Sequence, residues 1–520
     1  ALLDSPVAFV LGQQARWAGL YARTVDALAT AGRAAAALAA AEGSKSRLLA
    51  GLVGRGEVAA PAGIPSALLE RERALAARLN ALDAAGLAQR GATADSGRAV
   101  ADRAAVVAGL REVWDEMAGR GPAAADYVAV RRGDRLAAAD LARLAGSLEP
   151  GAALLSLFTT GARTLLFLWR AGADEPLLVE AAVEPDALRY DYLSSYEDEV
   201  LNRAALWELG RPLTHRWRAL GQPLLGPLRP HLAGVDHLVI APESVYHQLP
   251  LHALWLSDDG DTLLDHCAVS TVPELSVLER LRRRGAIGAL ETEFLPRNSV
   301  SKVSGPTAAV FGYTPADPAT AQGARERAIF LGEAVAVARG LGVAPRLDGD
   351  AGGEALETAT AGPLRLLHLS CHGYFNSRDA LESGVLLAGG VYTARRFLQR
   401  RLPVELVTLS ACQTGISASL GGDEMAGLSM ALLTAGASSL LLGLWSVNAV
   451  TTAAMMVDFY DRLWGGAAAP GAGSAPATKA EALRRTMLAL RGGRLIAPQA
   501  EFDPADPYYW APFALIGDWR

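Results

Sequence analysis

Cysteine is scarce in this chain, which has 520 residues and three cysteines, Cys267, Cys371 and Cys412. An odd, small cysteine count in a large chain argues against a disulfide framework and favours a reducing compartment, so we expect a cytoplasmic protein. The chain also lacks a large net charge of either sign. The formal net charge is -6 and the basic residues do not cluster, which argues against nucleic-acid binding. Hydrophobic residues make up 51% and charged residues 20%, a globular composition, and the length predicts roughly two to four domains.

Targeting and membrane-spanning signals are lacking too. The N-terminus has neither the basic start nor the small-residue cleavage motif of a signal peptide, and without an initiator Met we expect residues to have been removed upstream. Residues 425–457 contain no acidic residue, lysine or arginine, but glycine, serine and threonine interrupt them, whereas a bilayer span needs about 20 apolar residues in a row. We therefore expect a helix, a buried strand and a second helix there, and no membrane contact.

Helical periodicity dominates residues 1–150, which are rich in alanine. Two segments each place four apolar residues on one helix face. They are Leu68, Leu75, Leu79 and Leu82 in the first, and Val106, Leu110, Val113 and Met117 in the second. Ser66 is the expected N-cap of the first helix. We predict antiparallel helices; helix-pair repeats near Trp17 are the alternative, but no repeating consensus supports a full array.

From Gly151 onwards the apolar pattern changes to that of an α/β protein. Residues 153–158 and 164–169 flank a predicted hairpin turn at Thr160 and Gly161. A helix over 196–220 and a strand over 237–240 complete a first α/β unit, which we assign to 151–285. Residues 286–307 are rich in turn formers and poor in apolar residues, and are predicted to be a linker.

The remaining residues, 308–520, alternate between strand and helix patterns, which predicts a mainly parallel sheet covered by helices. The expected strands are 308–311, 364–370, 404–411 and 439–444, and the expected helices are 325–341, 424–435 and 478–491. Residues 465–477 have low complexity and are predicted to form an exposed loop. The last segment, 507–519, is too aromatic to be a loose tail.

Two of these predicted strands stop at reactive side chains. Residues 364–370 lead into Cys371, His372 and Gly373, and residues 404–411 lead into Cys412, which a turn follows. Because chemistry in parallel α/β sheets gathers beyond the carboxyl ends of strands, we expect the imidazole and the thiol to meet at one edge. This arrangement is typical of a cysteine nucleophile and its general base.

The assignment within this group follows from strand geometry. Neighbouring side chains in an extended chain point to opposite faces, so Cys371 and His372 cannot serve each other. We assign Cys412 as the nucleophile and His372 as the base, because a thiol with a free pKa of about 8.5 needs a partner to ionise at neutral pH. The Gly373 and Cys412 N–H groups are the expected donors to the oxyanion.

Two other interpretations of these residues are open. A buried cysteine is often a small hydrophobic residue, and a histidine often a satisfied polar group. A zinc site is the second alternative, with His368, Cys371, His372 and Cys412 as ligands. In a strand, however, His368 and His372 would share a face about 13 Å apart, so we expect neither a metal nor another cofactor.

Several motifs, in order, resemble the CHAT family of caspase-like cysteine peptidases allied to separase. The resemblance covers residues 150–520 and includes Leu238–Pro242 with Leu249–Pro250, His368–Gly373, Ser383–Leu387, Leu409–Gly415, Gly422–Glu424, Ala435–Ala437, Leu444–Val447 and Pro507–Phe513. It implies a caspase-like α/β/α sandwich at 308–520, preceded by a degenerate, non-catalytic half at 151–285. It also implies a peptidase that acts through a thioester, with His372 and Cys412 in the roles assigned above.

The resemblance also implies partners and specificity. Family members carry helical repeats upstream that sense an activating protein, and bacterial members serve in defence by cutting substrates such as gasdermin-like pore formers. Many relatives have an acidic residue after the Leu-Trp-x-Val motif, but this sequence has the neutral Asn448 and Ala449 there. We expect a neutral or apolar residue before the scissile bond, unless Asp423 pairs with a basic one rather than capping a helix at Glu424.

The expected substrate contacts are few. Ser410 should line the specificity pocket, and the main chain of Trp445, Ser446 and Val447 should hold the substrate as an added β-strand. A catalytically silent scaffold that binds a partner protein is the remaining alternative from another functional class.

Overall fold

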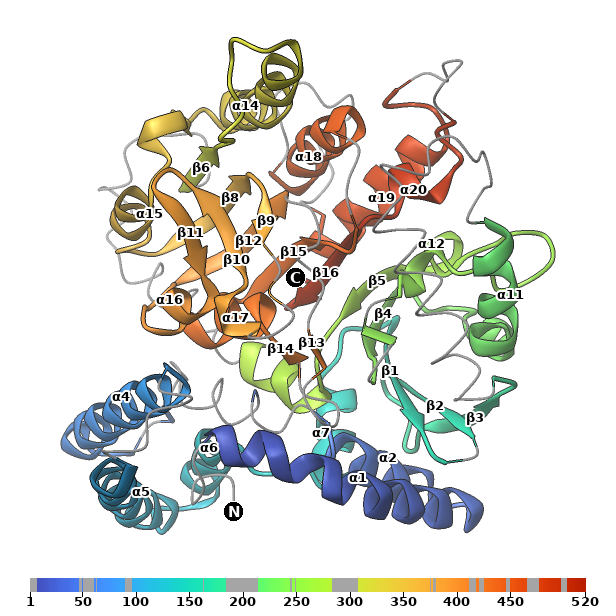
Figure 1. The fold of residues 1–520 in the computed structure, drawn as a ribbon. Helices are drawn as coiled ribbons and strands as arrows, with labels where there is room; N and C mark the ends of the chain where they lie inside the picture. The colour runs from blue at the N-terminus through green and yellow to red at the C-terminus, as the bar shows by residue number, and fades with distance from the viewer. Residues whose placement is uncertain are drawn as a thin grey trace.

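An 11-stranded sheet runs through the described part of the molecule and joins its two α/β halves (Figure 1). This computed structural model describes residues 7–45, 49, 60–61, 63–88, 96–161, 163–183, 214–243, 246–247, 249–282, 307–374, 376, 380–410, 418–419, 425–445, 449–464, 477–496 and 503–520. The strand order is β3-β2-β1-β4-β5-β16-β15-β12-β8-β6-β7. The strands are β1 (Ala152–Thr159), β2 (Thr164–Arg170), β3 (Leu177–Ala181), β4 (His237–Ala241), β5 (Ala268–Thr271), β6 (Ala308–Gly312), β7 (Arg346–Leu347), β8 (Leu364–Ser370), β12 (Val404–Ser410), β15 (Ser439–Gly443) and β16 (Phe513–Gly517).

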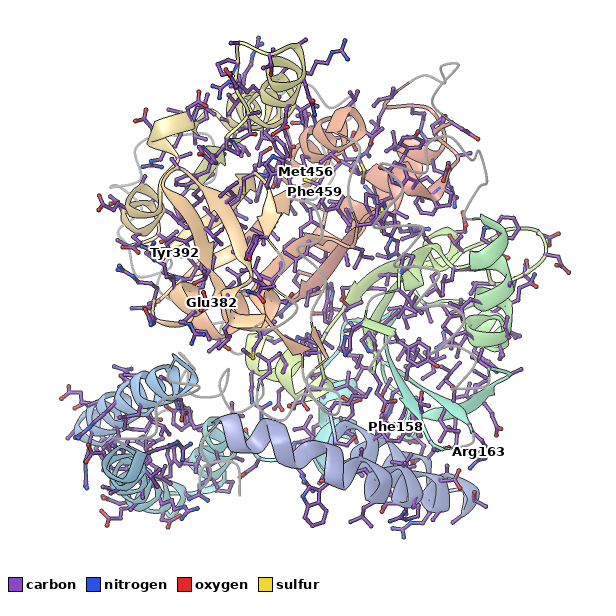
Figure 2. All side chains as sticks on the ribbon, in the orientation of Figure 1. Phe158, Arg163, Glu382, Tyr392, Met456 and Phe459 are labelled. Atoms are coloured by element: carbon purple, nitrogen blue, oxygen red, sulfur yellow. The ribbon has the colours of Figure 1, made fainter. Side chains whose placement is uncertain are left out.

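The C-terminal half is a sheet with helices on both faces, as expected for the predicted α/β class. Strands β7, β6, β8, β12 and β15 are parallel, and β16 closes this half antiparallel to β15. One face is covered by α14 (Ala321–Leu341), α18 (Ala449–Trp464) and α19 (Lys479–Arg491), and the other by α15 (Gly353–Ala359), α16 (Ala394–Leu398) and α17 (Leu428–Ala435). Met456 and Phe459 of α18 are fully buried in the first layer (Figure 2).

Strand β8 alternates its side chains between these two layers. Leu367, Leu369 and then Cys371 pack into the layer of α15, α16 and α17, whereas Leu366 packs with the α14 and α18 layer. His368 also faces the α14 and α18 layer, where its ring lies 5.8 Å from that of Tyr460 in α18. Successive side chains of a strand point to opposite faces of the sheet, so β8 places apolar residues in one layer and the polar His368 in the other while it is buried on both faces.

The sequence predicted most of these elements, with two errors at helix starts. Helix α14 begins four residues before the predicted position, with the Thr320 hydroxyl accepting a hydrogen bond from Gly323 N as its N-cap. Helix α17 begins at Leu428 after Gly427, not at Glu424. The hypothesis that Asp423 caps this helix is therefore wrong, because the short strand β14 (Met425–Ala426), paired with β13 (Ala418–Ser419), precedes it.

The predicted first α/β unit supplies the other half of the sheet. Strands β1 and β2 form the expected antiparallel hairpin, with Thr160 N donating to Arg163 O at the turn. Arg163 also binds Asp26 of α1 (Val7–Thr30), so the hairpin tip is tied to an N-terminal helix (Figure 2). Helix α11 (Thr214–Leu225) extends past the predicted end at Leu220, and the earlier part of that predicted helix lies outside the described residues.

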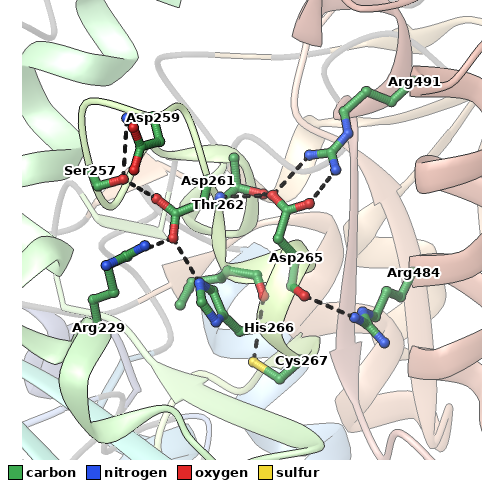
Figure 3. Close-up of polar contacts among 11 residues, drawn as sticks. Arg229, Ser257, Asp259, Asp261, Thr262, Asp265, His266, Cys267, Arg484 and Arg491 are labelled. Atoms are coloured by element: carbon green, nitrogen blue, oxygen red, sulfur yellow. Dashed lines mark hydrogen bonds and ion pairs between the residues drawn. The ribbon is translucent and has the colours of Figure 1, made fainter.

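The two halves meet between β5 and β16, where Thr271 pairs in parallel with Ile516. Polar contacts reinforce this junction at α12 (Leu263–His266), as Figure 3 shows. Arg491 of α19 pairs with Asp265, and Arg484 donates to Leu264 O. The aromatic C-terminal segment forms α20 (Pro507–Trp510) and β16, in line with the prediction that it is packed. The predicted linker, 286–307, lies outside the described residues except for its last residue.

The N-terminal region is helical, as predicted. Its helices are α1, α2 (Ala34–Glu42), α4 (Ser66–Ala88), α5 (Ser96–Ala118), α6 (Pro122–Arg132) and α7 (Ala138–Gly146). Helices α4 and α5 pack through the two predicted apolar faces, where Leu79, Leu110 and Val113 are fully buried. Helices α1, α2 and α7 instead share the core of the first α/β half. Within the described residues, every helix is too short or too polar to cross a membrane.

Candidate functional site

His372 lies just beyond the carboxyl end of β8, and its side chain is 34% exposed. Its Nε2 atom is 2.8 Å from Glu326 Oε1 and 3.4 Å from the Thr314 hydroxyl oxygen. The Phe330 ring packs against the imidazole, with 4.5 Å between ring centroids. The histidine predicted to act as a base is therefore half-buried, held by a carboxylate on one side and by an aromatic ring.

Helix α14 brings Glu326 and Phe330 to this position because it packs closely on β6. A Cβ atom at Gly312, the last residue of β6, would lie 2.7 Å from the Ala334 side chain, so only glycine allows this approach. Thr314 follows β6 by two residues and is buried. The end of β6 and the first three turns of α14 thus form one wall beside the end of β8.

The Glu326 carboxylate is ionised at neutral pH. Hydrogen bonds from Thr314, and then from His372, lower its pKa below the usual glutamate value against the opposing effect of burial. An ionised carboxylate can only accept hydrogen bonds, so the His372 Nε2 atom must carry a proton here. In the neutral ring, the remaining nitrogen, Nδ1, then holds the lone pair that a general base needs.

The main chain after His372 forms one edge of a small sheet, in which β9 (Gly373–Tyr374) pairs with β10 (Gly384–Leu387) and β10 with β11 (Gly390–Thr393). Leu386 N donates to His372 O at 2.8 Å, and Val385 lies opposite Gly373. In this antiparallel pattern Val385 and Gly373 form a non-hydrogen-bonded pair. The Gly373 N–H, which the sequence indicated as an oxyanion donor, is consequently directed away from β10.

The neighbouring strand β12 ends level with β8, because Ser410 pairs with Ser370 in parallel register. Ser410 is 1% exposed, and no described residue bonds its hydroxyl. Cys412 follows Ser410 by two positions and His372 follows Ser370 by two, but Cys412 lies outside the described residues. The structure therefore brings together the strand ends that the sequence predicted, and the distance between the two reactive side chains stays a prediction.

Of the other predicted substrate-binding residues, the structure describes only Trp445. Trp445 is fully buried, and its indole N–H donates to Tyr508 O at 3.2 Å, so its side chain belongs to the core. Four more lie outside the described residues: Asp423, Ser446, Val447 and Asn448.

The alternative zinc set does not converge on one point. His368 faces the α14 and α18 layer, whereas Cys371 packs with the α15, α16 and α17 layer on the opposite face of β8. Within the described residues, no group of three potential ligands is close enough to hold a metal ion. His368 instead belongs to a buried polar network, with Nδ1 2.9 Å from the Tyr460 hydroxyl, which in turn donates to Thr408.

Glu326, Thr314 and Phe330 were not predicted from the sequence. Glu326 is 46 residues from His372 along the chain, and its contact depends on how α14 packs against β6 and β8. A weak signal exists, because Glu326 and Glu333 are spaced by seven residues on one face of a predicted helix and both would meet the sheet.

The described residues define an α/β protein with an imidazole and a carboxylate paired beyond the carboxyl end of a central parallel strand. The CHAT domain family model matches residues 214–518, more than half of the chain, so the chain belongs to the CHAT family. This match confirms the family resemblance that the motifs indicated. A comparison with curated proteins gives no match.

Two solved structures show weak overall similarity. The separase of Saccharomyces cerevisiae, in complex with securin, is 8% identical with a TM-score of 0.45, over 96% of this chain and 40% of that one. The Arg-specific cysteine proteinase gingipain R of Porphyromonas gingivalis is 10% identical with a TM-score of 0.36, over 59% of this chain and 74% of that one.

Proposed function

We propose that this chain is a cysteine endopeptidase in which Cys412 is the nucleophile and His372 the general base. The observation that carries the proposal is the state of His372. It follows a central strand, is one-third exposed, and is held by an ionised carboxylate that leaves Nδ1 as the basic nitrogen. Histidines that only stabilise a core are commonly buried and bonded to other core groups; His368 is buried here, with Nδ1 bonded to the Tyr460 hydroxyl.

The proposed reaction begins with transfer of the Cys412 thiol proton to His372 Nδ1. The thiolate attacks the scissile carbonyl carbon, and the resulting oxyanion accepts hydrogen bonds from the Gly373 and Cys412 N–H groups. The direction of the Gly373 N–H, away from β10, supports this role. The imidazolium then protonates the leaving amine, which departs and leaves a thioester. His372 next takes a proton from water, whose attack on the thioester releases the acid and restores the thiol.

The substrate in this proposal is a protein segment bound in extended form along the main chain of Trp445, Ser446 and Val447. Ser410 contributes its hydroxyl to the pocket for the residue before the scissile bond. That hydroxyl is buried and has no partner among the described residues, and a contact with the bound substrate would supply one. With Asn448 neutral, the pocket favours a neutral or apolar side chain. A cleavage profile dominated by Arg or Lys, with Asp423→Ala harmless, would contradict this preference.

The biological setting is proposed on family resemblance alone. We propose a regulated peptidase that acts in bacterial defence on a neighbour-encoded protein, such as a gasdermin-like pore former, after an activating protein binds the N-terminal helices. The cytoplasmic setting stays a prediction from the cysteine content.

Two measurements test the proposed peptidase. Wild type and Cys412→Ala are incubated with neighbour-encoded proteins, and new termini are sequenced; we expect cuts with the wild type alone. A thiol-directed alkylating agent should label the wild type and Cys371→Ala, but not Cys412→Ala, because Cys371 is only 1% exposed. Equal labelling of Cys412→Ala and wild type, with no cuts, would instead support a silent scaffold.

A further inference from the structure

Helix α14 turns two carboxylates towards one face of β8. Glu326 and Glu333 are seven residues apart, so they project from the same side of the helix two turns apart. Glu326 contacts His372, whereas Glu333 accepts a hydrogen bond from the Ser370 hydroxyl at 3.1 Å and lies 3.2 Å from His368 Nε2. The helix is therefore connected to the strand at two separate points.

The three partners of these carboxylates lie on one side of β8 and of the chain that continues it. His368, Ser370 and His372 are spaced by two residues, which places their side chains on the same face of an extended chain. Glu333 is 3% exposed and Glu326 is 30% exposed. The inner carboxylate thus anchors the helix within the core, and the outer one reaches the rim where the candidate base lies.

Glu326 is itself held in place. The Thr314 hydroxyl donates to Oε1, the same oxygen that contacts His372, and Thr314 comes from the chain that follows β6 rather than from α14. The carboxylate is consequently oriented by one hydroxyl while it accepts from the imidazole. The packed Phe330 ring limits the remaining rotation of His372.

We propose that Glu326 is a positioning residue for the base, and this inference rests on the proposed function of His372. Its carboxylate accepts a hydrogen bond from the Nε2–H group, keeps the Nδ1 lone pair available and fixes the ring orientation. When the thiol S–H bond breaks and the Nδ1–H bond forms, the negative charge of Glu326 stabilises the imidazolium. In this proposal Glu326 acts through its contact with His372.

The first test measures the base without requiring catalysis. In a Cys412→Ala background, the titration of His372 is followed by NMR with and without Glu326→Gln, which keeps an acceptor but removes the charge. We expect the titration midpoint to fall by about one pH unit, because an opposite charge at hydrogen-bond distance favours the protonated ring. Glu354→Gln on α15, an exposed glutamate, is the matched control and should leave the midpoint unchanged.

The second test uses substrate turnover. Glu326→Met, which removes both charge and acceptor, should lower kcat by about 10- to 100-fold with KM within about twofold, as for other residues that orient a catalytic ligand. Glu326→Gln should recover part of that loss, because its amide oxygen can still accept from Nε2. Thermal unfolding midpoints that match the wild type will show that the variants are folded.

The outcomes separate this inference from the proposed function. An unchanged His372 titration in Glu326→Gln overturns the positioning role, even if the wild type cleaves protein. A raised KM with unchanged kcat in Glu326→Met also overturns it. If the wild type cuts nothing and Cys412 is not labelled, the peptidase proposal fails, whereas the NMR titration still decides whether Glu326 controls His372.

Discussion

Lys45 is fully buried and is bound by three groups, which makes it the most informative residue to change in the N-terminal region. Its Nζ atom lies 2.8 Å from Glu42 Oε1, from the Ser156 hydroxyl and from Ala241 O. Glu42, at the end of α2 and 3% exposed, also accepts from Leu275 N at 2.7 Å. The two side chains therefore join α2 to strands β1 and β4 and to the segment that follows β5.

Lys45→Met should destabilise this part of the protein by about 3–5 kcal/mol. The substitution keeps the chain length but leaves the Glu42 carboxylate buried without its countercharge, and removal of one partner from a buried ion pair typically costs that much. The Ala241 carbonyl also loses its donor. Adding Glu42→Gln should recover part of the loss, because the buried charge is then gone while an acceptor for Leu275 N remains.

Urea unfolding followed by tryptophan fluorescence measures the effect. With a slope of about 3 kcal/mol per molar urea, the transition that reports the first α/β half should move down by about 1–1.7 M. Arg71→Met is the matched control. Arg71 and Glu112 form an ion pair 3.4 Å long with side chains 54% and 72% exposed, so its loss should cost less than about 1 kcal/mol. A midpoint shift for Lys45→Met no larger than that for Arg71→Met would contradict a stabilising role of the buried ion pair.

Two further predictions concern other polar contacts. Tyr460→Phe should cost about 1–3 kcal/mol in urea unfolding, because it leaves His368 Nδ1 and the Thr408 hydroxyl without their partner in the core; a loss below about 0.5 kcal/mol would contradict the network. Burial raises the pKa of Asp261, but hydrogen bonds from Arg229, Ser257 and His266 lower it to about 2 (Figure 3). The ionised carboxylate should therefore stabilise the fold above pH 4, and this stabilisation should be lost as the pH falls from 3.8 to about 2. We expect a contribution of about 1 kcal/mol, because solvent screens the half-exposed Arg229. Comparison of wild type and Asp261→Asn across that range checks the sign, and a difference in stability that does not shrink towards acid would be inconsistent with it.

The strands that carry the candidate site were predictable to within one residue. Residues 364–370 and 404–411 are continuous apolar runs with abrupt stops, which is the pattern of central parallel strands, and the structure has β8 and β12 there. The parallel register that brings Ser370 level with Ser410 was expected from topology. Helix starts were less predictable, since the first residues of α14 and α17 depend on local caps at Thr320 and Gly427 rather than on apolar spacing.

The surroundings of His372 could not be predicted, because they depend on packing between elements distant in sequence. Glu326 reaches the imidazole only because Gly312 allows α14 to approach β6, and no local pattern encodes that distance. The anchoring of α2 by Glu42 and Lys45 is similar, since these charges sit in an alanine-rich helix end that predicts exposure. Buried charges of this kind contradict local composition, and only the three-dimensional contacts explain them.

The carboxyl ends of the strands differ in direction and in exposure between the two halves of the sheet. Strand β5 runs parallel to β16, which is antiparallel to β15, so the carboxyl ends of β4 and β5 lie at the opposite edge from those of β8 and β12. At the first edge, Lys45 occupies the end of β4 and is fully buried, whereas at the second edge His372 is 34% exposed. Solvent therefore reaches His372 at the second edge, whereas Lys45 at the first edge is closed to it. It follows that Lys45→Met should lower the stability of the fold without changing kcat below the unfolding transition. Glu326→Met should instead lower kcat and leave the unfolding midpoint unchanged.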